Sequence, residues 1–177
     1  MPSKPKNQVI IRPLRPEDGT AFLAAVRRSR ALHAAWITRK AKTKGEFARY
    51  LKRFGTDLHH GHAVVHRESG GLVGIININD VVRGNLQSGA IGYYAFAPFA
   101  GRGLMQEGML LVLKRAFGRL KLHRLEANIQ PHNRASIALA EKCGFVREGF
   151  SRRMIKLRGR WRDHERWALV AEDFKGA

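Results

Sequence analysis

The sequence has little cysteine, few acidic residues and no long apolar run. Its single cysteine, Cys143, cannot form an internal disulfide, which is typical of a protein from a reducing compartment. No apolar run is long enough to cross a bilayer, and residues 1–7 are polar, without the apolar core of a signal peptide. These absences disfavour a disulfide-stabilised secreted protein and a membrane-spanning one, so we expect a cytoplasmic protein.

The shortage of acidic residues leaves a large excess of positive charge. There are 33 lysines and arginines against 14 aspartates and glutamates, a formal net charge of +19, and such a field attracts acidic partners. No RNA-reading motif is visible, so the charge predicts either solubility alone or non-specific, salt-dependent contact with RNA, most simply that of the ribosome. The basic side chains cluster at Arg27, Arg28 and Arg30, at Arg39, Lys40, Lys42 and Lys44, and at Arg147, Arg152, Arg153, Lys156, Arg158, Arg160 and Arg162.

The residues that are present suit one domain. A chain of 177 residues is ample for one core and short for two, and its 44% apolar content is near the globular norm. We find no internal repeat and no linker long enough to divide the chain. We therefore expect residues 1–177 to form a single domain, with residues 1–7 as a loose basic arm.

The most informative pattern is the glycine turn Gly101-Arg102-Gly103. It follows an apolar strand expected over residues 93–98 and precedes a helix whose apolar positions recur at helical spacing up to Leu120. The first N–H groups of such a helix lack internal partners, and glycines let a phosphate approach the bare backbone. The pattern therefore predicts either a plain tight turn or a phosphate site.

Two kinds of phosphate site are excluded. No Lys-Ser or Lys-Thr follows these glycines, as a nucleoside-triphosphate P-loop requires. Gln106 stands where the dinucleotide-binding fingerprint has its third glycine. A different phosphate-bearing ligand is indicated.

A second helix start follows a strand expected over residues 124–129. Asn133 is a good N-cap for that helix, and Gly144 lies just beyond its end. Asn133 and Ser136 stand at the helix entrance, where their side chains either cap the helix or face a ligand lying between the two helices.

The remaining segments predict the scaffold. We expect strands over residues 9–11, 62–67, 72–81, 150–157 and 161–170, and a helix over residues 17–30. Thr43 and Glu46 form a capping box ahead of a further amphipathic helix.

Two other kinds of chemistry are disfavoured. His59, His60 and His62 could hold a metal, but the only other potential ligand nearby is Asp57, and no cysteine is close in sequence. A polar connection between a helix and a strand accounts for them better, so we expect no metal. Cys143 stands near a helix C-terminus, which disfavours a thiolate, so it is expected to be a packed, inert thiol.

Over nearly its whole length the chain resembles the GCN5-related N-acetyltransferase (GNAT) superfamily, and within it the ribosomal-protein alanine N-acetyltransferases. The resemblance implies an α/β fold with a mixed, mostly antiparallel sheet of six to seven strands flanked by about four helices. One departure is Pro98, where the family's phosphate motif usually begins with Gln or Arg. The residues that carry the likeness are 11–18, 101–107, 123–128, Pro131, His132, Asn133, Ser136, 143–145, Glu148, Gly149 and 159–164.

The resemblance also implies an acetyl-CoA co-substrate and a set of site residues. A backbone N–H near Phe96 or Ala97 is expected to stabilise the developing oxyanion, and Ser136 to hydrogen-bond or protonate the leaving thiolate. For a general base the candidates are Glu126, His132 and Asp163, although Glu126 could equally be a carboxylate paired with an arginine. The expected cofactor-binding residues are Phe96, Ala97, Gly101, Arg102, Gly103, Leu104, Met105, Asn128, Asn133, which holds the pantetheine arm, Ser136 and Lys142.

The acceptor is the least determined part of the hypothesis. An α-amino group, with a pKa of about 7.7 to 8.0, needs less help from a base than a lysine at about 10.4, so the lack of an obvious base favours a protein N-terminus. The resemblance points to the N-terminal alanine of a ribosomal protein. Two alternatives stay open: a small amine such as an aminoglycoside or polyamine, and an RNA-binding protein with a vestigial transferase site. The oligomeric state is left open.

Overall fold

A computed structural model describes residues 7–37 and 41–176. The predicted arm, apart from Asn7, and the basic residues Arg39 and Lys40 therefore lie outside the described residues. The strands are β1 (Val9–Arg12), β2 (His60–His66), β3 (Leu72–Val82), β4 (Ser88–Ala95), β5 (Arg124–Ile129), β6 (Val146–Leu157) and β7 (Arg160–Val170). The helices are α1 (Gly19–Arg28), α2 (Arg30–His33), α3 (Lys44–Lys52), α4 (Leu104–Gly118) and α5 (Arg134–Lys142), with short 3-10 turns at Pro16–Asp18, Arg53–Gly55 and Ala171–Asp173.

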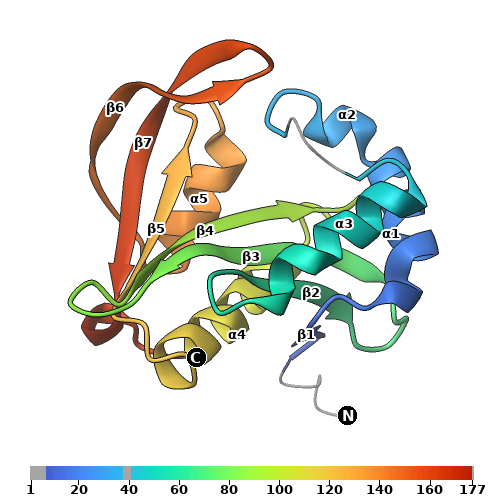
Figure 1. Cartoon of the computed structure of the whole chain (residues 1–177), viewed down its shortest axis with the longest axis horizontal. Helices are drawn as coiled ribbons and strands as arrows, with labels where there is room; N and C mark the ends of the chain where they lie inside the picture. Colours follow the sequence, from blue (N-terminus) through green and yellow to red (C-terminus); the bar gives the residue numbers. More distant parts are fainter. Residues whose placement is uncertain (1–6, 38–40, 177) are drawn as a thin grey trace.

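The strands form one seven-stranded sheet in the order β1-β2-β3-β4-β5-β7-β6 (Figure 1). Neighbouring strands are antiparallel except β4 and β5, which run parallel. These two strands pair only from Ser88 to Ala90 on β4 and from Arg124 to Glu126 on β5. Beyond Ala90 they diverge, which leaves a fork at the centre of the sheet.

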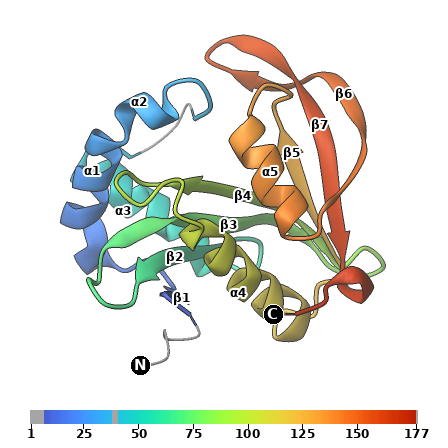
Figure 2. The ribbon, with the colours of Figure 1, turned by 180° about the vertical axis from the view of Figure 1, so that it is seen from behind.

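Two apolar cores lie on opposite faces of the sheet, because side chains alternate along each strand. One core contains Phe22 and Phe47 from α1 and α3, and the other contains Met109 and Leu113 from α4. Figures 1 and 2 show α1 and α3 covering one face and α4 crossing the other, with α5 beside the splayed β5. No helix in the described ranges is both long and apolar enough to cross a membrane.

Most expected elements are present, and the Thr43–Glu46 capping box is confirmed at the start of α3. The helix expected over residues 17–30 instead ends at Arg28, with the short α2 following it. Ser29 lies between the two: its hydroxyl donates to the Ala25 carbonyl at 2.7 Å and accepts from the Ala97 N–H at 3.0 Å. This long-range contact between Ser29 and Ala97 could not be read from helical periodicity.

Two expected strand limits were wrong. The strand expected over residues 93–98 runs from Ser88 to Ala95, because the mixed Ser88–Gly92 segment is held by its neighbours rather than by its own apolar pattern. The strand expected from residue 150 begins at Val146, directly after α5, where it pairs with the end of β7.

Candidate functional site

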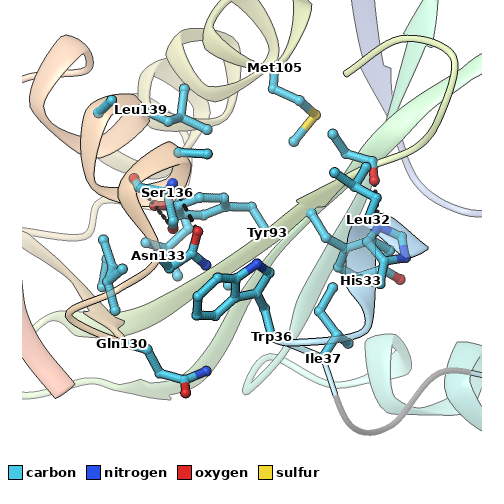
Figure 3. A pocket seen from close by; sticks show the side chains of 18 of the residues that line it. Leu32, His33, Trp36, Ile37, Tyr93, Met105, Gln130, Asn133, Ser136 and Leu139 are labelled. Carbon is cyan, nitrogen blue, oxygen red and sulfur yellow. Dashed lines mark hydrogen bonds between the residues drawn. The ribbon is translucent and has the colours of Figure 1, made fainter. Parts of the chain in front are cut away.

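The fork between β4 and β5 holds a cavity of about 490 Å³, here called the fork cavity. Its walls come from the α2 segment, β4, the glycine turn, α5 and the β6–β7 hairpin. Figure 3 shows Asn133, Ser136 and Leu139 on one side and Leu32, His33 and Ile37 on the other, with Tyr93 and the ring of Trp36 between them. At the outer rim the Arg158 guanidinium, in the turn of the hairpin, donates to the Ala34 carbonyl, so hairpin and α2 segment meet over the opening (Figure 1).

The glycine turn forms one end of the fork cavity. Gly101 and Gly103 have φ values of 77° and 78°, the left-handed region that glycine adopts at least cost. In the described chain none of the amides from residue 101 to 105 donates a hydrogen bond to another protein group. These amides, with Arg102 beside them, are arranged as the phosphate-site alternative of the sequence analysis requires. The side chain of Leu104 is buried in the core, so Leu104 can offer only its amide.

Other expected cofactor-binding residues lie along the same cavity. Met105, Asn128, Asn133, Ser136 and Lys142 all line it. Asn133 also caps α5, since its Oδ1 accepts from the Ser136 N–H at 3.2 Å. Its role as a cap and its position facing the cavity are therefore compatible.

The side chain of Ser136 is hydrogen bonded to Tyr93, a residue that the sequence analysis did not identify. The Ser136 hydroxyl donates to Tyr93 Oη at 2.9 Å, and the Tyr93 hydroxyl donates to the Ser136 carbonyl at 3.1 Å (Figure 3). Burial raises the pKa of Tyr93 to about 12, so its phenol stays protonated near neutral pH. Tyr93 looked like an ordinary apolar strand residue, and its only signal was an aromatic hydroxyl in a strand beside the glycine turn.

The expected oxyanion donors are corrected by the structure. The Phe96 N–H donates to the Val73 carbonyl at 2.7 Å, and the Ala97 N–H donates to Ser29 Oγ, so neither amide is free. Hydrogen bonding alternates along an antiparallel strand, and Phe96 faces β3. The Ala95 backbone therefore faces the fork, where its carbonyl accepts from His33 Nε2 at 2.6 Å. The register places the Ala95 N–H on the fork side of β4, one residue before the amides expected from the sequence.

None of the three expected general bases lines the fork cavity. Glu126 accepts from Arg124 Nε at 2.8 Å, as its alternative interpretation anticipated. His132 is exposed, and Asp163 is exposed and accepts from the Arg153 N–H at 2.7 Å. Strand alternation and the loop before α5 direct these side chains away from the fork cavity, which a linear motif does not reveal.

His164 does line the cavity and is 3% exposed. Its Nδ1–H donates to the Arg162 carbonyl at 3.0 Å, which leaves Nε2 as the acceptor of a neutral ring. Burial lowers the pKa of His164, so the neutral ring prevails at pH 7. It is therefore the one imidazole of the β6–β7 hairpin with a lone pair available at the site.

Cys143 takes no part in this chemistry. It is buried, and burial raises the pKa of its thiol to about 12, which disfavours the nucleophilic thiolate. Of the three histidines considered for metal binding, His62 lies on β2 as expected, and His60 lies on the same strand rather than in a connection. No group of three or more potential metal-binding side chains occurs among the described residues.

A second cavity of about 390 Å³ opens on the other side of β4. Asn77, Asn79 and Asp80 from β3, with Tyr50 and Arg53 at the end of α3, form its polar wall. Both cavities are lined by Ile91, Gly92, Tyr94, Asn128 and Ile155. A ligand in the second cavity can therefore approach one in the fork cavity across the point where β4 and β5 separate.

The fold and the fork cavity agree with the class of enzyme that comparison with known proteins identifies, the acetyltransferases. The family profile described as an acetyltransferase (GNAT) domain matches residues 8–146. The chain belongs to the GNAT family and is an acetyl-CoA-dependent N-acetyltransferase.

Several relatives and solved structures are similar to the chain. The "Probable N-acetyltransferase YjcK" of Bacillus subtilis is 36% identical over 124 residues, which are 70% of this chain and 68% of that protein. The [ribosomal protein uS5]-alanine N-acetyltransferase of Escherichia coli is 33% identical over 103 residues, 58% of this chain and 53% of that enzyme, so the match spans about half of the latter. Mycobacterium smegmatis RimJ, solved with CoA-disulfide, has a TM-score of 0.87 at 25% identity over 94% of this chain and 84% of that one.

A spermidine N-acetyltransferase from Vibrio cholerae, solved with CoA and spermine, shares the fold, with a TM-score of 0.80 at 20% identity. That likeness covers 94% of this chain and 97% of the other. The fold is thus common to transferases named for peptide and for polyamine acceptors, and it does not choose between these acceptors.

Proposed function

We propose that this enzyme transfers the acetyl group of acetyl-CoA to the N-terminal α-amine of a protein, with a ribosomal protein as the acceptor. The observation that carries the choice is the charge of the two cavities. Among the described lining residues there is a single carboxylate, Asp80, against the cations Arg53, Arg102 and Lys142. A polycation such as spermidine needs anionic partners, whereas a peptide N-terminus carries only one positive charge.

The donor is proposed to lie along the fork cavity. The amides of residues 101–105 and Arg102 would hold the pyrophosphate, and Lys142 would add a positive charge at the end of α5. Asn133 would bind the pantetheine arm. The Ala95 N–H, which faces the fork, would donate to the acetyl oxygen as negative charge develops there.

In the transfer step, the neutral acceptor nitrogen forms a bond to the acetyl carbonyl carbon, and the carbon–sulfur bond breaks. Tyr93 and Ser136 would stabilise the departing thiolate and supply its proton through their shared hydrogen bond. The amine loses one proton, which His164 Nε2 or water can accept. An α-amine, with a pKa of about 7.7 to 8.0, is already partly neutral at pH 7.

The relatives support the same acceptor. Proteins named as ribosomal-protein alanine N-acetyltransferases are among those similar to the chain, both in sequence and in fold. The alternative of a vestigial transferase site is disfavoured because the glycine turn, Asn133 and Ser136 all line one open cavity.

We also propose that the β6–β7 hairpin contacts RNA and so concentrates the enzyme at the ribosome. Eight exposed cations lie on residues 146–170, against three carboxylates. Each carboxylate already has a partner: Glu148 contacts Arg124, Asp163 accepts from the Arg153 N–H, and Glu165 contacts Arg147. The exposed rings of Phe150 and Trp161, which sequence analysis did not single out, lie among these cations and could stack on bases.

The test is to incubate the enzyme with acetyl-CoA and a ribosomal-protein fraction and to locate, by mass spectrometry of peptides, the mass gain of an acetyl group that replaces a hydrogen. Spermidine serves as the competing acceptor in a parallel reaction. Acetylation at protein N-termini is expected. Labelling of lysine side chains only, or turnover of spermidine alone, would contradict the proposal.

A further inference from the structure

The second cavity contains a polar atom that has no partner among residues 7–37 and 41–176. Asn77 lines this cavity, and its Oδ1 is buried without a hydrogen bond to any of these described residues. Burying a carbonyl oxygen without a donor carries a free-energy cost, and most such oxygens in folded proteins are paired. An unpaired oxygen in the wall of a cavity therefore indicates a donor that arrives with a ligand.

The other end of the same amide is already occupied. Asn77 Nδ2 donates to Tyr50 Oη at 2.8 Å, and the Tyr50 hydroxyl is also hydrogen bonded to Tyr94. These contacts hold the amide in one orientation, so its oxygen is the end left for a ligand. Burial raises the pKa of Tyr50, so its phenol stays neutral and introduces no charge beside the cavity.

The rest of the lining fits neutral hydrogen-bonding groups. Asn79 and Asn128 add two more amides, and the one carboxylate, Asp80, is balanced by one guanidinium, Arg53. Arg53 already donates to Asn79 Oδ1 at 3.4 Å. A wall of this kind can bind the N–H and C=O groups of a peptide main chain, and it offers little to a polycation.

We propose that the second cavity binds the first residues of the acceptor peptide and that Asn77 Oδ1 accepts a hydrogen bond from one of its main-chain N–H groups. This inference rests on the proposed function. Because five residues line both cavities, the two cavities adjoin, and the amine of a peptide bound in the second cavity can reach the acetyl group in the fork cavity. Asn77 is thus a positioning residue for the acceptor and touches no reacting atom.

The test uses Asn77→Leu, which removes the oxygen, and Asn77→Asp, which keeps an oxygen acceptor. Asn77→Leu is expected to raise the KM for a peptide acceptor about tenfold, the usual effect of losing one hydrogen bond of about 1.4 kcal/mol. The dissociation constant for acetyl-CoA, measured by calorimetry, should not change. Asn77→Asp should stay within about threefold of the wild type, and Asn85→Leu, an exposed residue away from both cavities, controls for losing a surface amide.

A set of acceptor peptides, each methylated at a different main-chain nitrogen, identifies the N–H group that pairs with Asn77 Oδ1. One methylation should raise the KM of the wild type but have little further effect on Asn77→Leu, since both changes remove the same bond.

If Asn77→Leu binds acetyl-CoA normally and the peptide KM is unchanged, the inference is wrong while the proposed function stands. If the wild type binds acetyl-CoA but acetylates no peptide, the proposed function itself fails. Should Asn77→Leu not fold, Asn77→Ala, which also removes the oxygen with a smaller side chain, gives the same decision with the methylated peptides.

Discussion

At the scale of single residues, the proposed chemistry depends on a phenol and a hydroxyl that are 43 positions apart in the chain. Tyr93 comes from β4 and Ser136 from the first turn of α5, and they meet only because the fork opens between them. Burial keeps the phenol protonated by raising its pKa to about 12. The pair can therefore act as one proton donor toward the leaving thiolate.

We expect Tyr93→Phe to lower kcat by about ten- to a hundredfold, the lower part of the range for removing a general acid. The KM for acetyl-CoA should change little, since the phosphate-binding turn is untouched. Ser136→Ala should act in the same direction, and the double variant should be little worse than the worse single variant because the two groups act as a unit. Steady-state kinetics check this, and fully additive losses would contradict it.

A second residue-scale prediction concerns stability in acid. Burial lowers the pKa of His62 from 6.5 to about 4, so between these values the unfolded chain binds a proton that the folded chain does not. The free energy of unfolding should therefore be complete above pH 6.5 and fall by about 3 kcal/mol toward pH 4. His60 and His164, whose pKa values are also lowered by burial, act in the same direction.

Urea unfolding at pH 7 and pH 5 measures this effect. His62→Gln should show a smaller loss of stability between the two pH values than the wild type, whatever its stability at pH 7. His132→Gln, at an exposed position, is the control. An unchanged pH dependence in His62→Gln would show that His62 is not the cause.

At the scale of elements, the start of α4 depends on glycine. Gly103 is the N-cap of α4 and has a φ of 78°, which a residue with a Cβ adopts only with strain. Gly118, at the other end of the same helix, has no atom within 4 Å of an added Cβ and no positive φ. The two glycines thus form a matched pair for testing the turn.

We expect Gly103→Ala to destabilise the protein by about 1 kcal/mol and to weaken acetyl-CoA binding about tenfold, because the amides no longer converge on one anion. Gly118→Ala should be neutral or stabilising by about 0.5 kcal/mol, with unchanged binding. Thermal unfolding and calorimetry measure both quantities. Normal acetyl-CoA binding by Gly103→Ala would show that the turn does not hold the phosphate.

At the scale of the whole molecule, the net charge of +19 is unevenly distributed. In the described part of the hairpin, most of the eight cations have no carboxylate partner, whereas the linings of the two cavities hold only three cations and one carboxylate among the described residues. A basic exterior around a weakly charged site suits an enzyme that is held near RNA while it acts on a peptide.

We expect Arg152→Glu, Lys156→Glu and Arg160→Glu together to weaken binding to single-stranded RNA. They should also lower the slope of log affinity against log salt by about 2, since each lost phosphate contact removes about 0.7. The same charge change on α3, at Lys44, Arg49 and Lys52, is the control. Filter binding at several salt concentrations checks this, and equal losses in both triple variants would mean that net charge alone determines binding.

The sequence by itself determined the local features: the glycine turn, the helix caps at Thr43 and Asn133, the burial of Cys143 and the family. These depend on neighbours within a few positions, or on motifs short enough to read directly. Only the tertiary structure decided which side chains share a cavity. It gave the Phe96 and Ala97 amides partners within the protein, paired Glu126 with Arg124, and brought Tyr93, Ser136 and His164 to the fork, because strand divergence and side-chain alternation depend on contacts between segments far apart in the chain.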